Sequence, residues 1–187
     1  MNLHQPALHG LLRVLGLLLA FCATALPGQV VSRESQLKAV YIYHFTEFVD
    51  WPKTAFPTPA SPILIGVLGP DPFGGYLEQA IRDERVHDRR LIIQRYQRVQ
   101  EVENCHLLFI SASENARLEG ILAELKGRSI LTVGETEDFA LRGGMIQFIN
   151  VQNHIRFRIN LGAARAAKIQ ISSKMLRSAE VLNAGKE

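Results

Sequence analysis

Four short apolar runs, each bounded by turn-forming residues, limit the fold of this chain more than any other feature. They cover residues 63–69, 91–96, 105–111 and 129–134 and consist largely of aliphatic and β-branched residues. Runs this short indicate buried strands rather than helices. Helical patterns over 33–49, 73–82 and 114–126 and from residue 172 onward separate or flank them. This alternation predicts an α/β fold with parallel βαβ crossovers and flanking helices.

The C-terminal part adds an antiparallel element to this sheet. Residues 144–149 and 154–159 alternate between apolar and polar side chains on either side of Gln152 and Asn153. Two such runs joined by two turn residues predict a hairpin. Because a strand's side chains alternate, Arg156 and Arg158 should share one face, and Phe157 should lie on the other. The expected fold is a single-domain mixed sheet.

The first predicted helix, residues 33–49, carries large apolar side chains at helical spacing. They are Leu37, Val40, Tyr41, His44, Phe45 and Phe48. We expect the aromatic members, together with Trp51, to pack this helix onto the sheet.

The N-terminus has the pattern of a secretory signal peptide. A weakly cationic start ending at Arg13 leads into a short apolar run, and Ala23 and Ala25 provide the small residues of a cleavage site. We therefore expect residues 1–25 to be cleaved and residues 26–187 to form a single periplasmic domain. An uncleaved membrane anchor and a lipoprotein attached through Cys22 remain alternatives.

Composition excludes several classes of protein. Hydrophobic residues make up 47% of the 187 residues and charged residues 21%, which suits one globular domain. The net charge of +3 is too small for the chain as a whole to bind nucleic acid. Its two cysteines cannot form a multi-thiolate zinc site. Cys105 would be the single thiol after cleavage, and we interpret it as a buried strand residue.

No catalytic or cofactor motif stands out. The turn at residues 69–75 follows a strand and precedes a helix, as a phosphate-binding turn would. However, it lacks the glycine spacing, and Pro70 and Pro72 donate no N–H. Asp71 and Ser113 are interpreted as helix caps. The histidines lack metal-ligand spacing. We therefore expect no catalytic residues, metal or cofactor, although an exported small-ligand-binding protein or enzyme that uses the crevice at residues 69–75 remains an alternative.

Charge is distributed unevenly along the chain. Residues 26–140 hold 12 basic and 16 acidic side chains, whereas residues 141–187 hold 8 basic and 2 acidic ones. The C-terminal quarter is therefore basic, and this charge serves either solubility or the docking of an acidic partner or anionic lipid.

A series of motifs resembles the YfiR family across nearly the whole mature chain. Residues 38–52 (KAVYIYHFTEFVDWP) are similar to the opening of that family after its signal peptide. Further matches follow in order at Asp71-Pro72-Phe73-Gly74, residues 105–110, 131–134, 143–146, 155–160 and 171–176.

This resemblance implies a regulator rather than an enzyme. Family members inhibit an inner-membrane diguanylate cyclase by binding its periplasmic sensor region, which lowers cyclic di-GMP and biofilm formation. They are released from the cyclase when an outer-membrane lipoprotein captures them. Some members carry paired cysteines near the turn at Gly143 and Gly144, but residues 140–149 here contain none. The resemblance leaves a homodimer open.

We expect the partner to bind between residues 156 and 171. Regulation by binding needs apolar anchors within a polar rim. Arg156, Arg158, Arg165 and Lys168 would steer an acidic partner, and Ile169 would supply part of the anchor. The alternative is that Ile169 and Ile171 belong to the core.

Overall fold

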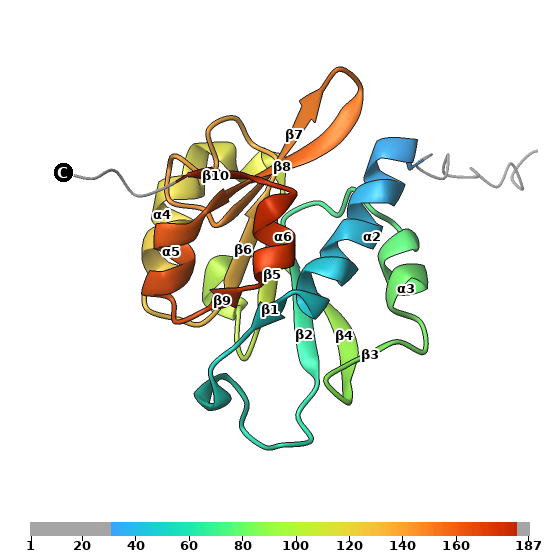
Figure 1. Cartoon of the computed structure of the whole chain (residues 1–187), viewed down its shortest axis with the longest axis vertical. Coiled ribbons are helices and arrows are strands. Elements are labelled where there is room, and N and C mark those ends of the chain that lie inside the picture. The colour runs from blue at the N-terminus through green and yellow to red at the C-terminus, as the bar shows by residue number, and fades with distance from the viewer. Residues whose placement is uncertain (1–30, 183–187) are drawn as a thin grey trace, which may run out of the picture. The chain divides into compact units, whose positions relative to one another are not determined.

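The computed structural model describes residues 31–182, which form a mixed, mostly parallel sheet of eight strands with helices on both faces (Figure 1). Its strand order is β10-β8-β7-β6-β5-β2-β4-β3. The four predicted strands lie side by side and parallel in its centre, as β4, β2, β5 and β6. The expected α/β class with parallel crossovers is confirmed.

The elements have the following bounds. The sheet consists of β2 (Ile63–Leu68), β3 (Arg85–Val86), β4 (Arg89–Tyr96), β5 (Leu107–Ile110), β6 (Leu131–Gly134), β7 (Ile146–Val151), β8 (His154–Asn160) and β10 (Glu180–Leu182). A separate pair consists of β1 (Val49–Asp50) and β9 (Gln170–Ile171). The helices are α2 (Arg33–Glu47), α3 (Tyr76–Ile81), α4 (Leu118–Leu125), α5 (Leu161–Ala166) and α6 (Ser173–Arg177), with short 3₁₀ turns η1 (Lys53–Ala55), η2 (Val99–Glu101) and η3 (Ala112–Arg117).

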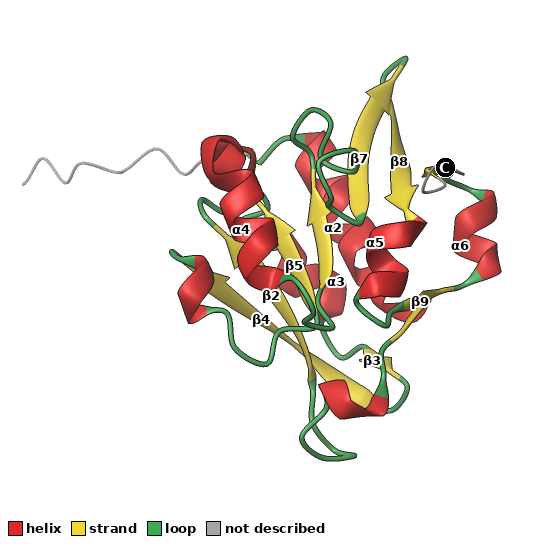
Figure 2. Cartoon of the chain, turned by 90° about the vertical axis from the view of Figure 1, so that its left-hand side faces the viewer, coloured by secondary structure: helices red, strands yellow, loops and turns green. Residues whose placement is uncertain are grey.

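Two apolar cores lie on opposite faces of the sheet, as expected where parallel strands are buried on both sides. One core joins the sheet to α2, α3, α5 and α6, with Phe45 and Phe109 among its largest members. The other joins it to α4 and the neighbouring 3₁₀ turns through Leu118 and Ile121. Figure 2 shows α4 on the opposite side of the strands from α2.

The predicted hairpin is confirmed. Strands β7 and β8 pair antiparallel with Val151 opposite His154, and both turn residues, Gln152 and Asn153, have positive φ angles of 52° and 61°. Two positive φ angles are typical of the type I′ turn that matches strand twist. Phe157 is buried and Arg156 is exposed, so the two residues lie on opposite faces as predicted.

Three local predictions are wrong. The last helix ends at Arg177, and the chain then forms β10, parallel to β8. Helix α5, which was not predicted, begins at Asn160, whose side chain accepts the N–H of Ala163. Asp71 and Ser113 do not cap helices. The Asp71 carboxylate accepts the N–H of Phe73 within a turn, and Ser113 lies inside η3.

The N-terminal helix α2 is held by a buried ion cluster. The ammonium group of Lys38 lies 2.5 Å from a carboxylate oxygen of Glu135, directly after β6, and 2.5 Å from one of Glu34. Burial alone would lower the pKa of Lys38, but the hydrogen bonds and charges of both glutamates outweigh it and raise the pKa. Lys38 therefore stays charged and ties α2 to the carboxyl end of the sheet.

Truncation of the inward face of α2 should unfold the protein much more easily than truncation of its outward face. Phe45 is 2% exposed, and its ring lies 5.6 Å from that of Phe148 and 5.4 Å from that of Phe157. We expect Phe45→Ala to lower the free energy of unfolding by about 3–5 kcal/mol. The control, Val40→Ala, lies on the same helix at 42% exposure and should cost less than about 1 kcal/mol. Urea unfolding measures both, and equal losses would contradict this packing.

Candidate functional site

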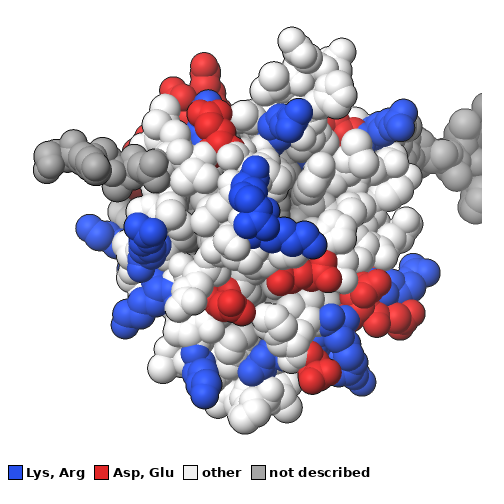
Figure 3. Space-filling model, viewed as in Figure 1, with Lys and Arg blue, Asp and Glu red and all other residues white. Residues whose placement is uncertain are grey.

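A large hollow with a mostly apolar lining lies between α2 on one side and β8 and α6 on the other. We call it the α2–β8 groove. It has a volume of about 730 Å³ and is lined by Tyr41, His44, Phe45, Glu47, Phe48, Phe157, Lys174, Met175 and Ser178. Figure 3 shows a largely uncharged surface between the two helices, with basic side chains over α6.

Helix α2 forms one wall because it has more apolar surface than the sheet covers. Ala39, Ile42 and Phe45 are buried, but Leu37 and Val40 remain 47% and 42% exposed. Exposed large apolar side chains that continue into a hollow are typical of interaction sites.

Aromatic rings form the floor of the groove. The ring of Tyr41 lies 5.9 Å from that of Phe157 and 6.3 Å from that of Phe45. Tyr41 and Phe48 are half-buried and pack against the core, as does Trp51, whose indole N–H donates to the carbonyl of His106 at 3.0 Å. The expected packing of these aromatic residues is confirmed, but Tyr41 and Phe48 also line the groove.

Strands β1 and β9 hold the base of the groove. They pair Val49 with Ile171, and the N–H of Ser172 donates to the carbonyl of Phe48 at 2.9 Å. This pairing ties the end of α2 to the start of α6. It also places the ammonium group of Lys174 5.0 Å from the centre of the Phe48 ring, where cation and aromatic face attract each other. Within residues 31–182, no carboxylate forms an ion pair with Lys174.

The structure does not bring the expected partner residues into one patch. Arg156 lies exposed in the outer half of the hairpin. Arg158 donates two hydrogen bonds, of 3.0 and 3.1 Å, to the carboxylate of Glu180. Arg165 and Lys168 line a different hollow, of about 520 Å³, together with Asp50 and Trp51. Ile169 is 1% exposed, so its expected part as a surface anchor is wrong and it belongs to the core.

Protein groups occupy the first part of the turn at residues 69–75. A side chain at Gly69 would lie 2.8 Å from a carboxylate oxygen of Glu114, and the φ of Gly69 is +84°. The Asp71 carboxylate accepts a hydrogen bond from the N–H of Phe73 and also forms an ion pair with Arg95 at 2.6 Å. These contacts give the alternative crevice no support.

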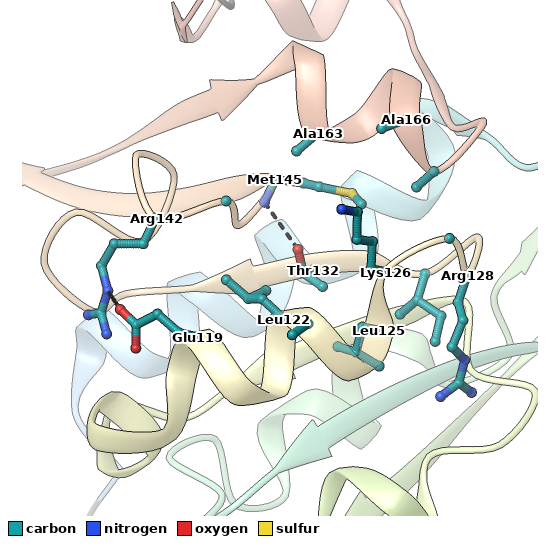
Figure 4. Close-up of a pocket in the computed structure, with 15 residues that line it drawn as sticks. Glu119, Leu122, Leu125, Lys126, Arg128, Thr132, Arg142, Met145, Ala163 and Ala166 are labelled. Carbon is teal, nitrogen blue, oxygen red and sulfur yellow. Dashed lines mark hydrogen bonds and ion pairs between the residues drawn. The ribbon is translucent and has the colours of Figure 1, made fainter.

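Another hollow, of about 350 Å³, lies between α4 and α5 (Figure 4). Leu122 of α4 and Ala163 and Ala166 of α5 form its walls, and an ion pair between Arg142 and Glu119 at 2.7 Å lies at one end. The hydroxyl of Thr132 accepts the N–H of Met145. The polar groups at this hollow thus mainly bond to one another.

Cys105 and His106 are buried rather than reactive. Burial raises the pKa of the Cys105 thiol to about 12, and the thiol donates to the carbonyl of Leu107 at 3.0 Å. Burial lowers the pKa of His106 to about 4, and the charge of Arg89 lowers it further. The Nδ1 atom of His106 accepts the N–H of Leu64 at 3.1 Å, so the neutral ring carries its proton on Nε2. The interpretation of Cys105 as a structural thiol is confirmed.

Within residues 31–182, no three histidine, cysteine, aspartate or glutamate side chains lie close enough together to hold a metal ion. In the same part of the chain, no helix combines the length and the apolar character needed to cross a membrane. The expected signal peptide and its cleavage site lie outside the described residues.

His106 should make the protein less stable in mild acid. Its folded pKa of about 4 lies below the ordinary value of 6.5, so the unfolded chain binds more protons between these values and stability falls as the pH falls. We expect the free energy of unfolding to drop by about 2 kcal/mol from pH 7.5 to pH 5. Urea unfolding of wild type and His106→Gln at both pH values measures the contribution of His106 to this drop. The control, His154→Gln, alters an exposed ring. An unchanged pH dependence in His106→Gln would refute the assignment.

Comparison with known proteins identifies the family of the chain. No curated protein matches the chain. The YfiR/HmsC-like family matches residues 35–180, which include most of α2, the groove and the start of β10. This chain therefore belongs to the YfiR/HmsC-like family, a family of regulators rather than of enzymes.

Proposed function

We propose that this chain is a periplasmic protein that inhibits an inner-membrane diguanylate cyclase by binding its periplasmic sensor region. The inhibition lowers cyclic di-GMP and biofilm formation. Family membership over residues 35–180 carries this proposal. The signal-peptide pattern of residues 1–25 supports export, and the unreactive state of Cys105 and His106 agrees with a regulator that acts by binding.

We place the partner in the α2–β8 groove. Binding energy concentrates at apolar anchors that are surrounded by polar residues and are dehydrated on binding. Leu37 and Val40 offer such anchors on the exposed side of α2, each one helical turn before a residue that lines the groove, and Lys174 also lines it. The exposed cations Arg156, Arg165 and Lys168 would mainly speed the encounter with an acidic sensor region.

Release would follow from competition for the same groove. An outer-membrane lipoprotein that covers Leu37 and Val40 would prevent the cyclase from binding there. Because the same apolar side chains would serve both partners, variants of the groove should weaken both complexes together.

Variants of the groove should lose regulation without losing stability. Val40→Asp places a charge on a surface that the partner must dehydrate, so we expect at least about a tenfold loss of affinity. The cellular level of cyclic di-GMP should rise toward that of a strain that lacks the gene. Complementation of such a strain, with cyclic di-GMP measured by mass spectrometry, is the test.

The matched control is Ile92→Asp. Ile92 is 45% exposed on β4, near the opposite edge of the sheet, and receives the same new charge. We expect this variant to repress like wild type. If Val40→Asp folds with an unchanged melting temperature and still represses fully, the groove is not the binding site. If deletion of the gene leaves cyclic di-GMP unchanged, the proposed function itself fails.

A further inference from the structure

Strand β10 covers only half of the outer edge of β8. β8 runs from His154 to Asn160, but β10 pairs only with residues 158–160. Among residues 31–182, no other strand pairs with this edge of β8. Figure 2 shows the hairpin of β7 and β8 extending away from the helices. The sheet thus ends in an open edge at residues 154–157.

The hairpin register determines which backbone groups face this edge. In a two-residue hairpin the residues flanking the turn, Val151 and His154, exchange hydrogen bonds, and every second pair after them does the same. The N–H of Asn160 donates to the carbonyl of Met145 at 2.8 Å, which agrees with this phase. The N–H and C=O of Ile155 and the N–H of Phe157 therefore point outward, beyond β10.

The contacts of β10 indicate which side chains a segment bound at this edge would need. Glu180 lies directly opposite Arg158 in the register, and its carboxylate accepts both hydrogen bonds of the guanidinium group. Arg156 lies on the same face of β8, two residues nearer the turn, and forms no ion pair within the described part of the chain. A segment that extended β10 along β8 toward the turn could place one more acidic side chain opposite Arg156.

The other face of such a segment would meet the groove. Phe157 lines the α2–β8 groove together with Tyr41 and Met175, and Ile155 lies two residues along on the same face of β8. Because side chains of a strand alternate, residues next to the acidic one would point toward these apolar groups.

We propose that the free edge of β8 binds an extended segment of a partner protein by strand addition. The segment alternates apolar side chains, which enter the α2–β8 groove, with an acidic side chain, which pairs with Arg156. Main-chain hydrogen bonds supply affinity in this mode, and the alternate pockets supply specificity. The inference rests on the proposed function, because the regulated partner provides the segment.

Amide hydrogen exchange of the mature protein tests this directly. The probe is a capped seven-residue peptide of alternating valine and glutamate, and its valine–lysine counterpart is the control. We expect the glutamate peptide to slow exchange at the N–H groups of Ile155 and Phe157 by about tenfold or more. The N–H groups of Arg156 and Arg158 already bond to β7 and should change little. The lysine peptide should protect neither set.

Charge reversal sharpens the test. Arg156→Glu should weaken binding of the glutamate peptide by about tenfold and let the lysine peptide bind in its place. The control Arg90→Glu introduces the same charge on β4 and should leave the affinities for both peptides unchanged.

Three outcomes would overturn the proposal. In the first, the peptide leaves exchange at Ile155 and Phe157 unchanged. In the second, it protects amides along β4 instead. In the third, Ile155 and Phe157 are protected without peptide, and this protection grows with protein concentration. The last outcome would show that a second copy of this chain covers the edge. If Val40→Asp raises cyclic di-GMP while these amides stay unprotected, the regulatory groove stands and strand addition alone fails.

Discussion

The need to cover both faces of the central parallel strands determines the rest of this structure. Strands β2, β5 and β6 are buried on both sides, so helices must pack above and below them. Helix α2 covers one face of the sheet through Phe45 and is tied to the end of β6 by the Lys38–Glu135 ion pair. The side of α2 that carries Tyr41 and Phe45 also forms one wall of the α2–β8 groove.

The same geometry explains why the groove is well defined although it is open. Strands β1 and β9 link the end of α2 to the start of α6, and the packed rings of Tyr41, Phe45 and Phe157 fill the space below. Restrained walls lose little conformational entropy when a partner binds. A regulator that acts by contact needs such a surface more than it needs reactive groups.

The elements that could be predicted from the sequence are those with a local signal. The central strands show short apolar runs, and the hairpin shows alternation around Gln152 and Asn153. Strand β10 could not be predicted in this way, because residues 180–182 become a strand through pairing with β8, which is distant in sequence. Helix α5 is only six residues long and depends on its cap at Asn160.

The candidate site was harder to predict than the fold. The aromatic residues of α2 and the exposed Arg156 could be found from spacing and charge. However, burial of Ile169 and pairing of Arg158 with Glu180 depend on contacts between distant segments. Leu37 and Val40 have the same helical spacing as core residues, but they remain exposed because they lie on the side of α2 that faces away from the buried Ala39 and Ile42. An apolar arc on α2 wider than one helix face was the available signal.

Site-specific photo-crosslinking in living cells tests the central claim most directly. A photoreactive residue at position 40 lies on the exposed side of α2, one helical turn before His44, which lines the groove. One at position 92 lies on β4, near the other edge of the sheet. The account predicts that position 40 captures a membrane-anchored diguanylate cyclase, identified by mass spectrometry, and that position 92 does not. Capture of the cyclase at position 92 but not at position 40 would contradict it.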